Sequence, residues 1–398
     1  MEATAPSLDP AQNREFAYSD PPPFHVEAQG QSLRFYPAGR DRLQALLALI
    51  DSAQATLKVC FYIFAEDETS IQVRNALAAA ARRGVEVKLV VDGFGAAASD
   101  SFFEPLAAAG GRYWRFSAKW SQRYLIRNHQ KMVIADGSRA MIGGFNVENG
   151  YFAPPEENGW NDLGLVIEGS LVEQLADWFA LMEEWVSDPH AQWRAIRRIV
   201  RDWDPGEGPV RLLVGGPTRG LSTWVKVVSQ DLMKARRLDM MMAYFSPPKR
   251  LVRRIARVAQ QGEARLVLAG KSDNGATIGA ARALYRRLLR SGTQIWEFAA
   301  CKLHTKLIVL DDHTYVGSAN FDMRSLYINM ELMIVIEDAA LADRMRAFIA
   351  QHLAGSVAVT PERHRKRATL WNRLRWRLSW FLVGVVDYSV SRKLNLGL

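Results

Sequence analysis

The chain has 398 residues, about the length of two ordinary domains, and 48% of them are apolar against 23% charged. This composition excludes a disordered chain, a collagen-like chain and a pure coiled coil, and the two cysteines, Cys60 and Cys301, exclude a disulfide scaffold or a thiolate metal cluster. The net charge of +9 points to a polyanionic partner, either nucleic acid or an anionic membrane surface.

Residues 1–30 are predicted to form a flexible, proline-rich N-terminus. They are mostly polar or small and include the run Pro21–Pro23. They contain no apolar segment typical of a secretory signal, and no stretch of the chain reaches the roughly 18 consecutive apolar residues of a membrane-spanning helix. We therefore expect the protein to remain in the cytoplasm.

Two similar halves follow, over residues 31–190 and 209–358. In each half, strand-like apolar runs alternate with helical patterns. The strand-like runs lie at residues 57–64, 85–91, 238–245 and 264–268, and the helical patterns at residues 70–83, 102–109, 249–261 and 276–290. This alternation predicts right-handed βαβ units, an α/β fold and largely parallel sheets.

Residues 191–208 are predicted to link the two halves. The segment carries four arginines and ends in a proline–glycine pair, namely Arg194, Arg197, Arg198, Arg201, Pro205 and Gly206. A basic linker exposed at the surface is the favoured interpretation, and a second membrane contact is the alternative.

A polar motif occurs once in each half. In the first half its residues are His129, Lys131, Asp136, Gly143, Gly144 and Asn146. In the second half they are His304, Lys306, Asp311, Gly317, Ser318 and Asn320. An acidic residue then follows each copy, Asp162 in the string NDLGLVIEG and Glu331 in the string MELMIVIED. The repetition in this order indicates a duplicated functional unit rather than two structural histidines.

The spacing within the motif predicts a phosphate-binding pocket. A histidine and a lysine two residues apart on a strand point to the same face of the sheet. The asparagine adds amide donors, and small residues such as Gly144 and Ser318 let the backbone approach an anion closely. Because the motif is duplicated, two half-pockets can face each other.

Two histidines facing one phosphodiester predict a two-step displacement. One imidazole can attack phosphorus and form a phosphohistidine, while the other protonates the leaving oxygen and later deprotonates the incoming nucleophile. The lysines and asparagines of the motif would stabilise the phosphate oxygens, so we expect neither a metal ion nor a cofactor. Asp162 and Glu331 are the candidates to hold the far nitrogen of each histidine.

Other polar residues near these strands have different predicted roles. Asp136 and Asp311 lie at the far end of each motif strand, too far from the lysine to contact the same phosphate, and are predicted to be structural turn or capping residues. Four weaker pocket candidates lie near the ends of the first strand of each half, namely Tyr62, Glu66, Tyr244 and Ser246. Packing and capping are the alternative roles for these four.

The two motif copies resemble those of the phospholipase D superfamily, and within it those of the bacterial cardiolipin synthases. The resemblance covers roughly residues 30–350 and extends to the local strings Tyr62–Phe64, Val91–Gly93 and Asn320–Ser325. It implies two similar α/β/α sandwich domains with mixed sheets, related by a pseudo-twofold axis, with one active site at their interface. It also implies that His129 is the nucleophile and His304 the general acid and base.

The same resemblance implies transfer of a phosphatidyl group from a phospholipid to an alcohol, with phosphatidylglycerol as the expected acceptor. The chain looks more like the shorter members of the branch, which lack N-terminal spanning helices. Hydrolysis by the same site is the first alternative. A nuclease and a non-catalytic lipid-binding module are further alternatives, although the concentration of positive charge in the tail, rather than along a groove, argues against nucleic acid.

Residues 359–398 form a basic, tryptophan-rich, amphipathic tail. Basic residues mixed with tryptophan and followed by a short apolar run are typical of a helix in the headgroup layer of a membrane. The predicted membrane contacts are Arg373, Arg375, Trp376, Arg377, Trp380 and Phe381. This predicts peripheral binding to an anionic membrane on its cytoplasmic face; the alternative is a helix that docks its aromatic side chains on the protein.

Overall fold

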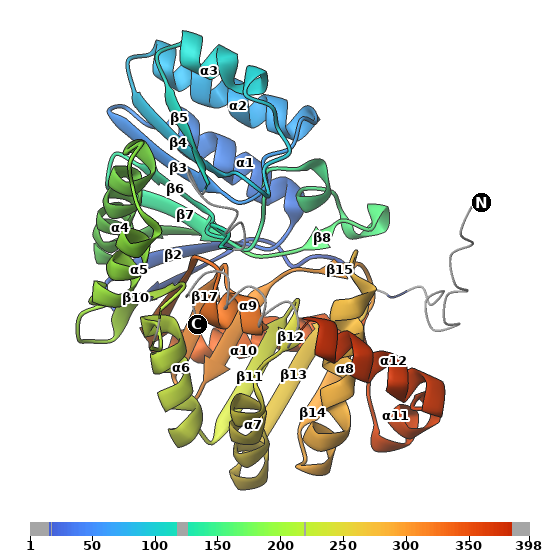
Figure 1. The fold of residues 1–398 in the computed structure, drawn as a ribbon. Helices are drawn as coiled ribbons and strands as arrows, with labels where there is room; N and C mark the ends of the chain where they lie inside the picture. The colour runs from blue at the N-terminus through green and yellow to red at the C-terminus, as the bar shows by residue number, and fades with distance from the viewer. Residues whose placement is uncertain (1–15, 17, 118–125, 219, 384–398) are drawn as a thin grey trace.

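The computed structural model describes residues 16, 18–117, 126–218 and 220–383, which form two stacked halves, each built on an eight-stranded sheet (Figure 1). Most of the predicted flexible N-terminus and the last part of the tail, residues 384–398, lie outside the described residues. Residues 24–28 of that N-terminus form β1, an edge strand paired with β2, and so belong to the first sheet.

The two sheets have matching strand orders. The first sheet runs β1 (Phe24–Ala28), β2 (Gln31–Tyr36), β9 (Gly164–Glu168), β7 (Arg139–Gly143), β6 (Met132–Ala135), β3 (Thr56–Phe61), β4 (Glu86–Asp92) and β5 (Arg112–Phe116). The second runs β10 (Val210–Gly215), β19 (Glu331–Glu337), β17 (His313–Gly317), β16 (Lys306–Leu310), β11 (Arg237–Met242), β13 (Glu263–Ala269), β14 (Gln294–Phe298) and β20 (Ser356–Ala358). In this spatial order, the seven strands that run from β2 to β5 in the first sheet therefore correspond one for one to the seven that run from β10 to β14 in the second.

The sheets are mixed, as expected, but the prediction that they are largely parallel is wrong. Within the described residues of the two eight-stranded sheets, only β3–β4–β5 and β11–β13–β14 pair in parallel, and the other neighbours are antiparallel. Parallel pairing needs a crossover helix, whereas β6–β7 and β16–β17 are hairpins that reverse the chain within a few residues. Asp136 and Asp311 stand at these reversals with positive φ of 52° and 47°.

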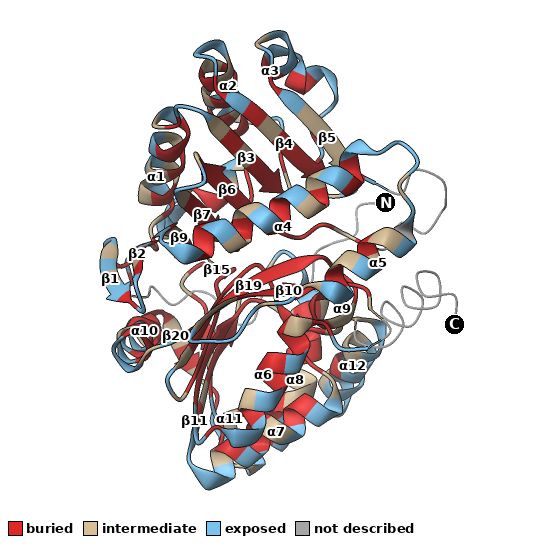
Figure 2. Cartoon of the chain, turned by 90° about the vertical axis from the view of Figure 1, so that its left-hand side faces the viewer, coloured by how far each residue is buried: buried red, intermediate tan, exposed pale blue. Residues whose placement is uncertain are grey.

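Helices cover both faces of each sheet. On the outer faces lie α1 (Gly39–Asp51), α2 (Glu68–Arg82) and α3 (Glu104–Ala108) in the first half, and α6 (Thr223–Lys234), α7 (Lys249–Gln261) and α8 (Gly275–Arg290) in the second. On the inner faces, α4 (Ser170–Ser187) and α10 (Ala339–Gln351) pack into one continuous core with strands of both sheets. The buried strands between partly exposed helices give each half the predicted α/β/α layering (Figure 2).

The predicted linker is exposed at the surface only on its basic side. Its residues form the helix α5 (Trp193–Asp202), and Ile196 and Val200 are fully buried in the core shared by the two halves. Arg194 and Arg198 on its other face are exposed. Burial of this apolar face fixes one half against the other.

The tail forms two helices, α11 (Pro361–Arg367) and α12 (Leu370–Phe381), which pack against α8. Trp376 is only 4% exposed and its ring stacks on that of His364 at 5.5 Å, so its predicted role as a membrane contact is wrong. Packing against the protein removes the large apolar surface of this ring from water, and this favours the docked position. Within the described residues, no helix is both long and apolar enough to cross a membrane.

Candidate active site

The two histidines lie where the halves meet. His129 and His304 are not on the strands themselves, contrary to the prediction; they stand in extended segments just before β6 and β16. Their backbone N–H groups bond across the interface instead, His129 to the Met330 carbonyl at 2.9 Å and His304 to the Asn161 carbonyl at 2.7 Å. These bonds recur with pseudo-twofold symmetry and bring the motif copies together.

Each histidine is held by the acidic residue of the opposite half. Nδ1 of His129 lies 3.0 Å from Oε2 of Glu331, and Nδ1 of His304 lies 2.6 Å from Oδ2 of Asp162. Both carboxylates are fully buried. An Nδ1–H donated to a carboxylate fixes the tautomer, so Nε2 of each ring carries the lone pair.

The motif lysines are buried beside these rings. Nζ of Lys131 donates to the His129 carbonyl at 2.5 Å, and Nζ of Lys306 donates to the His304 carbonyl. Burial lowers the pKa of Lys131 to about 7 and that of Lys306 to about 8. Burial, helped by the lysine charges, also lowers the pKa of His129 well below its usual value and that of His304 to about 3. Both imidazoles are therefore neutral at neutral pH.

The two carboxylates differ in their affinity for protons. Burial raises the pKa of Glu331 to about 7. Burial also acts to raise the pKa of Asp162, but His304, Lys306 and Arg42 outweigh it and hold that pKa below its usual value. Asp162, which holds His304, therefore stays ionised, whereas Glu331, which holds His129, can gain a proton near neutral pH.

Gly144 and Ser318, the residues of the predicted phosphate-binding turn, lie against these two acids. A Cβ at Gly144 would lie 2.7 Å from Oδ1 of Asp162, so only glycine leaves room for that carboxylate. The hydroxyl of Ser318 donates to Oε2 of Glu331 at 2.5 Å, and its backbone N–H donates to the Leu332 carbonyl. Gly144 directly follows β7, and Ser318 directly follows β17. At these positions their atoms lie against the carboxylates of Asp162 and Glu331.

The two motif asparagines are buried but differ in their contacts. Oδ1 of Asn146 accepts the backbone N–H of Ile63 at 3.1 Å and so fixes the end of β3. Oδ1 of Asn320 has no hydrogen-bond partner among the described residues. Asn320 is thus the one of the pair with unused hydrogen-bonding capacity at the site.

Asp136 and Asp311 lie at the opposite end of β6 and β16 from the lysines. Asp136 accepts the backbone N–H groups of Gln54, Ala55 and Thr56 at 2.7 to 2.9 Å, which fixes the start of β3. Asp311 binds the equivalent N–H groups before β11. Their contacts are those of structural residues.

Aromatic side chains outside the duplicated motif line the site. The Tyr151 hydroxyl lies 3.4 Å from Nε2 of His304, and the rings of Tyr151 and Trp160 meet the His304 ring edge-on. The Tyr62 ring lies 4.9 Å from that of His129, and the Tyr244 ring 6.5 Å from that of His304. Of the weaker candidates, these two tyrosines lie beside the histidines.

The other weaker candidates are placed differently. Glu66 accepts the backbone N–H and hydroxyl of Ser99 at an exposed position. Ser246 is buried in β12 (Phe245–Ser246), which pairs with β18 (Phe321–Asp322). Among the described residues, neither Glu66 nor Ser246 contacts a motif histidine.

Sequence reasoning also missed the buried arginine Arg42. Its guanidinium donates to the backbone carbonyls of Asp162 at 2.7 Å and Tyr151 at 2.5 Å. It thereby fixes two residues that contact His304. The sequence of α1 has the pattern of an amphipathic surface helix, and such a pattern does not indicate which arginine turns inward. No sequence signal could therefore have identified Arg42.

Comparison with known proteins identifies the family. A family model described as "Cardiolipin synthase, PLD-like domain" matches residues 46–183 and 228–353, which include both histidines. The chain belongs to the cardiolipin synthase family. Cardiolipin synthase B of Escherichia coli K12 is 28% identical over 353 residues, which cover 86% of each chain. Major cardiolipin synthase ClsA of Bacillus subtilis is 28% identical over 371 residues, 90% of this chain and 76% of that one.

A solved structure supports the fold assignment of this cardiolipin synthase family member. The phosphatidylserine synthase of Haemophilus influenzae superposes with a TM-score of 0.74 over 93% of this chain and 97% of that one, at 14% sequence identity. In the described part of the chain, no three His, Cys, Asp or Glu side chains are grouped to hold a metal ion.

Proposed function

We propose that this enzyme moves a phosphatidyl group from one phospholipid to a second in two displacements, with a phosphohistidine on His129 between them. Membership of the cardiolipin synthase family makes it an enzyme of the phosphatidyltransferase class. The observation that carries the mechanism is the crossed pairing of two neutral, buried histidines with two buried carboxylates. Such a pairing provides a nucleophile and a separate acid–base group for one phosphodiester.

In the first step, Nε2 of His129 attacks phosphorus, the P–N bond forms and the bond to the leaving alkoxide breaks. The alkoxide takes its proton from Nε2 of His304. An incoming phosphate anion offsets the lysine charges that lower the pKa of His304, so this ring gains its proton as the substrate binds. In the second step, the acceptor hydroxyl gives its proton to His304 and its oxygen attacks phosphorus, which releases His129.

The order of the histidines follows from their acids. A general acid must carry a positive charge for part of the cycle, and Asp162, held as an anion, stabilises an imidazolium at His304. Glu331, with its pKa near 7, supports a neutral His129 instead. Lys131 and Lys306 neutralise the charge that develops on the non-bridging phosphate oxygens.

The acceptor is proposed to be phosphatidylglycerol, so that two phosphatidylglycerol molecules give cardiolipin and glycerol. The test is a product assay with detergent-dispersed phosphatidylglycerol, comparing the wild type with His129→Ala and His304→Ala. We expect cardiolipin and glycerol in equal amounts from the wild type and neither from the variants. Phosphatidic acid alone would show a hydrolase, and no lipid turnover would refute the proposed substrate.

We further propose that α12 binds the enzyme to the anionic cytoplasmic face of the membrane. Its side away from the protein carries large apolar side chains that are 47 to 85% exposed, namely Leu370, Trp371, Leu374, Leu378, Phe381 and Leu382. They recur at helical spacing and are flanked by exposed arginines at 373, 375 and 377. We call this surface the α12 stripe. An exposed apolar stripe with flanking arginines fits the boundary between lipid headgroups and acyl chains.

The α12 stripe lies near the edge of the active site. The Tyr244 hydroxyl donates to Asp273, directly before α8, and the Tyr244 ring faces that of His304. Ser379 of α12 approaches Gly279, about 6 Å along the axis from the start of α8. Docking of α12 would therefore bring the active-site edge close to the lipid surface.

Replacing two leucines of the stripe tests this membrane contact. Leu374→Ser/Leu378→Ser should weaken binding to phosphatidylglycerol vesicles by about tenfold or more, because each buried leucine contributes about 1.5 kcal/mol or more. Cosedimentation with vesicles measures the effect. The matched control is Ile71→Ser/Leu221→Ser, which replaces two exposed aliphatic side chains of the same size outside α12. Equal binding by both variants would show that the stripe does not enter the membrane.

A further inference from the structure

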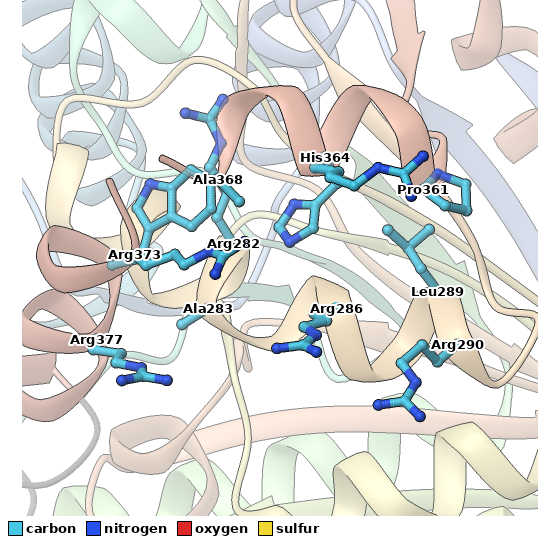
Figure 3. A pocket seen from close by; sticks show the side chains of 12 residues that line it. Arg282, Ala283, Arg286, Leu289, Arg290, Pro361, His364, Ala368, Arg373 and Arg377 are labelled. Atoms are coloured by element: carbon cyan, nitrogen blue, oxygen red, sulfur yellow. The ribbon is translucent and has the colours of Figure 1, made fainter. Parts of the chain in front are cut away.

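An arginine-lined cavity of about 390 Å³ lies between α8 and the tail helices (Figure 3). None of its lining residues is acidic. Half of them are arginines, namely Arg282, Arg286, Arg290, Arg365, Arg373 and Arg377. Those of α8 follow one another at i, i+4 and i+8, so they share one helix face opposite Arg373 and Arg377. Two rows of like charge thus face a common space.

Most of this charge has no ion-pair partner among the described residues. Arg282 is paired with Glu297, whose carboxylate also binds Arg367, and Arg365 lies 3.9 Å from Glu362. Arg286, Arg290, Arg373 and Arg377, in contrast, form no ion pair with another described residue. Like charges held around one cavity repel one another, so an anion in the cavity would be stabilised there.

The buried wall of the cavity adds an unused donor. Trp376 lines it, and the indole Nε1–H of Trp376 is buried with no hydrogen-bond acceptor in the described part of the chain. His364 forms part of the same wall; burial lowers its pKa, and Arg373, Arg282 and Arg286 add to this against the opposing effect of Glu297. Guanidinium groups and an indole N–H together match an oxyanion that can accept several bonds, as a phosphate does.

The neighbouring surface indicates where that phosphate comes from. A second cavity of about 220 Å³ shares Arg377 and Ala283 with the first and is also lined by Trp380 and Lys249. Nε1 of Trp380 likewise has no acceptor among residues 16–383 as far as the structure describes them. The α12 stripe lies on the far side of the same helix, so a lipid whose acyl chains lie beside the stripe can place its phosphate among the arginines.

We propose that this α8–α12 pocket binds the headgroup phosphate of an anionic phospholipid, as a second lipid site apart from the paired histidines. The proposal rests on the proposed function only in placing the enzyme at a phospholipid surface. The site holds the enzyme on the membrane and takes no part in phosphoryl transfer.

The test measures binding of the full chain to phosphatidylcholine vesicles that contain phosphatidylglycerol. All variants carry His129→Ala, so no lipid is turned over, and failure of the catalytic proposal would leave the result unaffected. Arg286→Gln/Arg290→Gln/Arg373→Gln should weaken vesicle binding about tenfold or more. The control Arg40→Gln/Arg194→Gln/Arg198→Gln removes the same charge from exposed positions outside the pocket and should change binding by about threefold at most.

A second variant and a soluble competitor identify the ligand. Trp376→Phe keeps the ring but removes the N–H, and should weaken vesicle binding several-fold with an unchanged melting temperature. Glycerol 3-phosphate should not displace the wild type from vesicles. Equal losses in the pocket and control variants would show bulk charge only and overturn the site. Displacement by glycerol 3-phosphate in the wild type would show a soluble phosphate site and overturn the assignment to lipid.

Discussion

His304→Asn should accumulate a covalent phosphatidyl-enzyme that His129→Asn cannot form. With His129 intact, its Nε2 can still attack phosphorus when the leaving group departs without the proton that His304 normally supplies, but resolution of the intermediate needs His304 to deprotonate the acceptor. Each substitution should lower kcat by about a thousandfold or more, because the two rings act as a unit and removing either stops the cycle. A phosphatidyl p-nitrophenyl ester labelled in its diacylglycerol moiety, whose leaving group departs as a stable anion, reveals the intermediate on denaturing gel electrophoresis.

The matched control for this experiment is His25→Ala. Nε2 of His25 also lies near a carboxylate, 2.7 Å from Glu27, but the pair is at the surface, so the variant should keep full activity. Label on His129→Asn but not on His304→Asn would reverse the assigned order. Absence of label from both, with rapid quenching, would contradict the covalent mechanism.

Asp162→Asn and Glu331→Gln should each lower kcat/KM by about 100- to 10,000-fold, because an amide cannot fix the tautomer or stabilise a charged ring. The crossed pairing adds a sharper expectation. Asp162→Asn should remove the far-downfield proton resonance of His304 Nδ1–H and leave that of His129, and Glu331→Gln should do the reverse. Proton NMR at low temperature, with ring-labelled histidine, measures both signals.

The pH profile gives an independent readout for Glu331. Its pKa is raised to about 7 by burial, so the carboxylate is neutralised as the pH falls through that value. The kcat/KM of the wild type should therefore decline below pH 7, and Glu331→Gln should lack this acid limb. Asp239→Asn, at a buried carboxylate paired with Arg265 and Arg346, should lower stability without changing the profile. Loss of the acid limb there too would mean that the limb reports unfolding.

The duplication in the sequence predicted which polar residues the fold brings together, because the motif repeats residue types that a packed core rarely keeps. His129, Lys131 and their counterparts His304 and Lys306 are all buried where the halves meet. The contacts of the small residues with the two acids were not predicted. Backbone approach to a phosphate and room for a carboxylate both favour glycine, so spacing alone could not distinguish the two uses of Gly144.

The tail shows a similar limit. Its composition predicted an amphipathic helix, and both interpretations of that helix describe part of the structure. Trp376 packs against His364, as a docked helix would, whereas Leu374 and Leu378 remain exposed on the other side. A sequence lists the residues of a helix face but not which face meets α8, because that choice depends on side chains more than 80 residues earlier in the chain.

The sequence by itself determined the α/β class, the two similar halves, the duplicated motif and the acids that serve it, since each is written in local patterns of hydrophobicity and spacing. Only the tertiary structure decided that Glu331 holds His129 and that Asp162 holds His304. It also decided that Arg42 and Tyr151 complete the site. These contacts join residues 109 to 202 positions apart, and they form only when both sheets share one core.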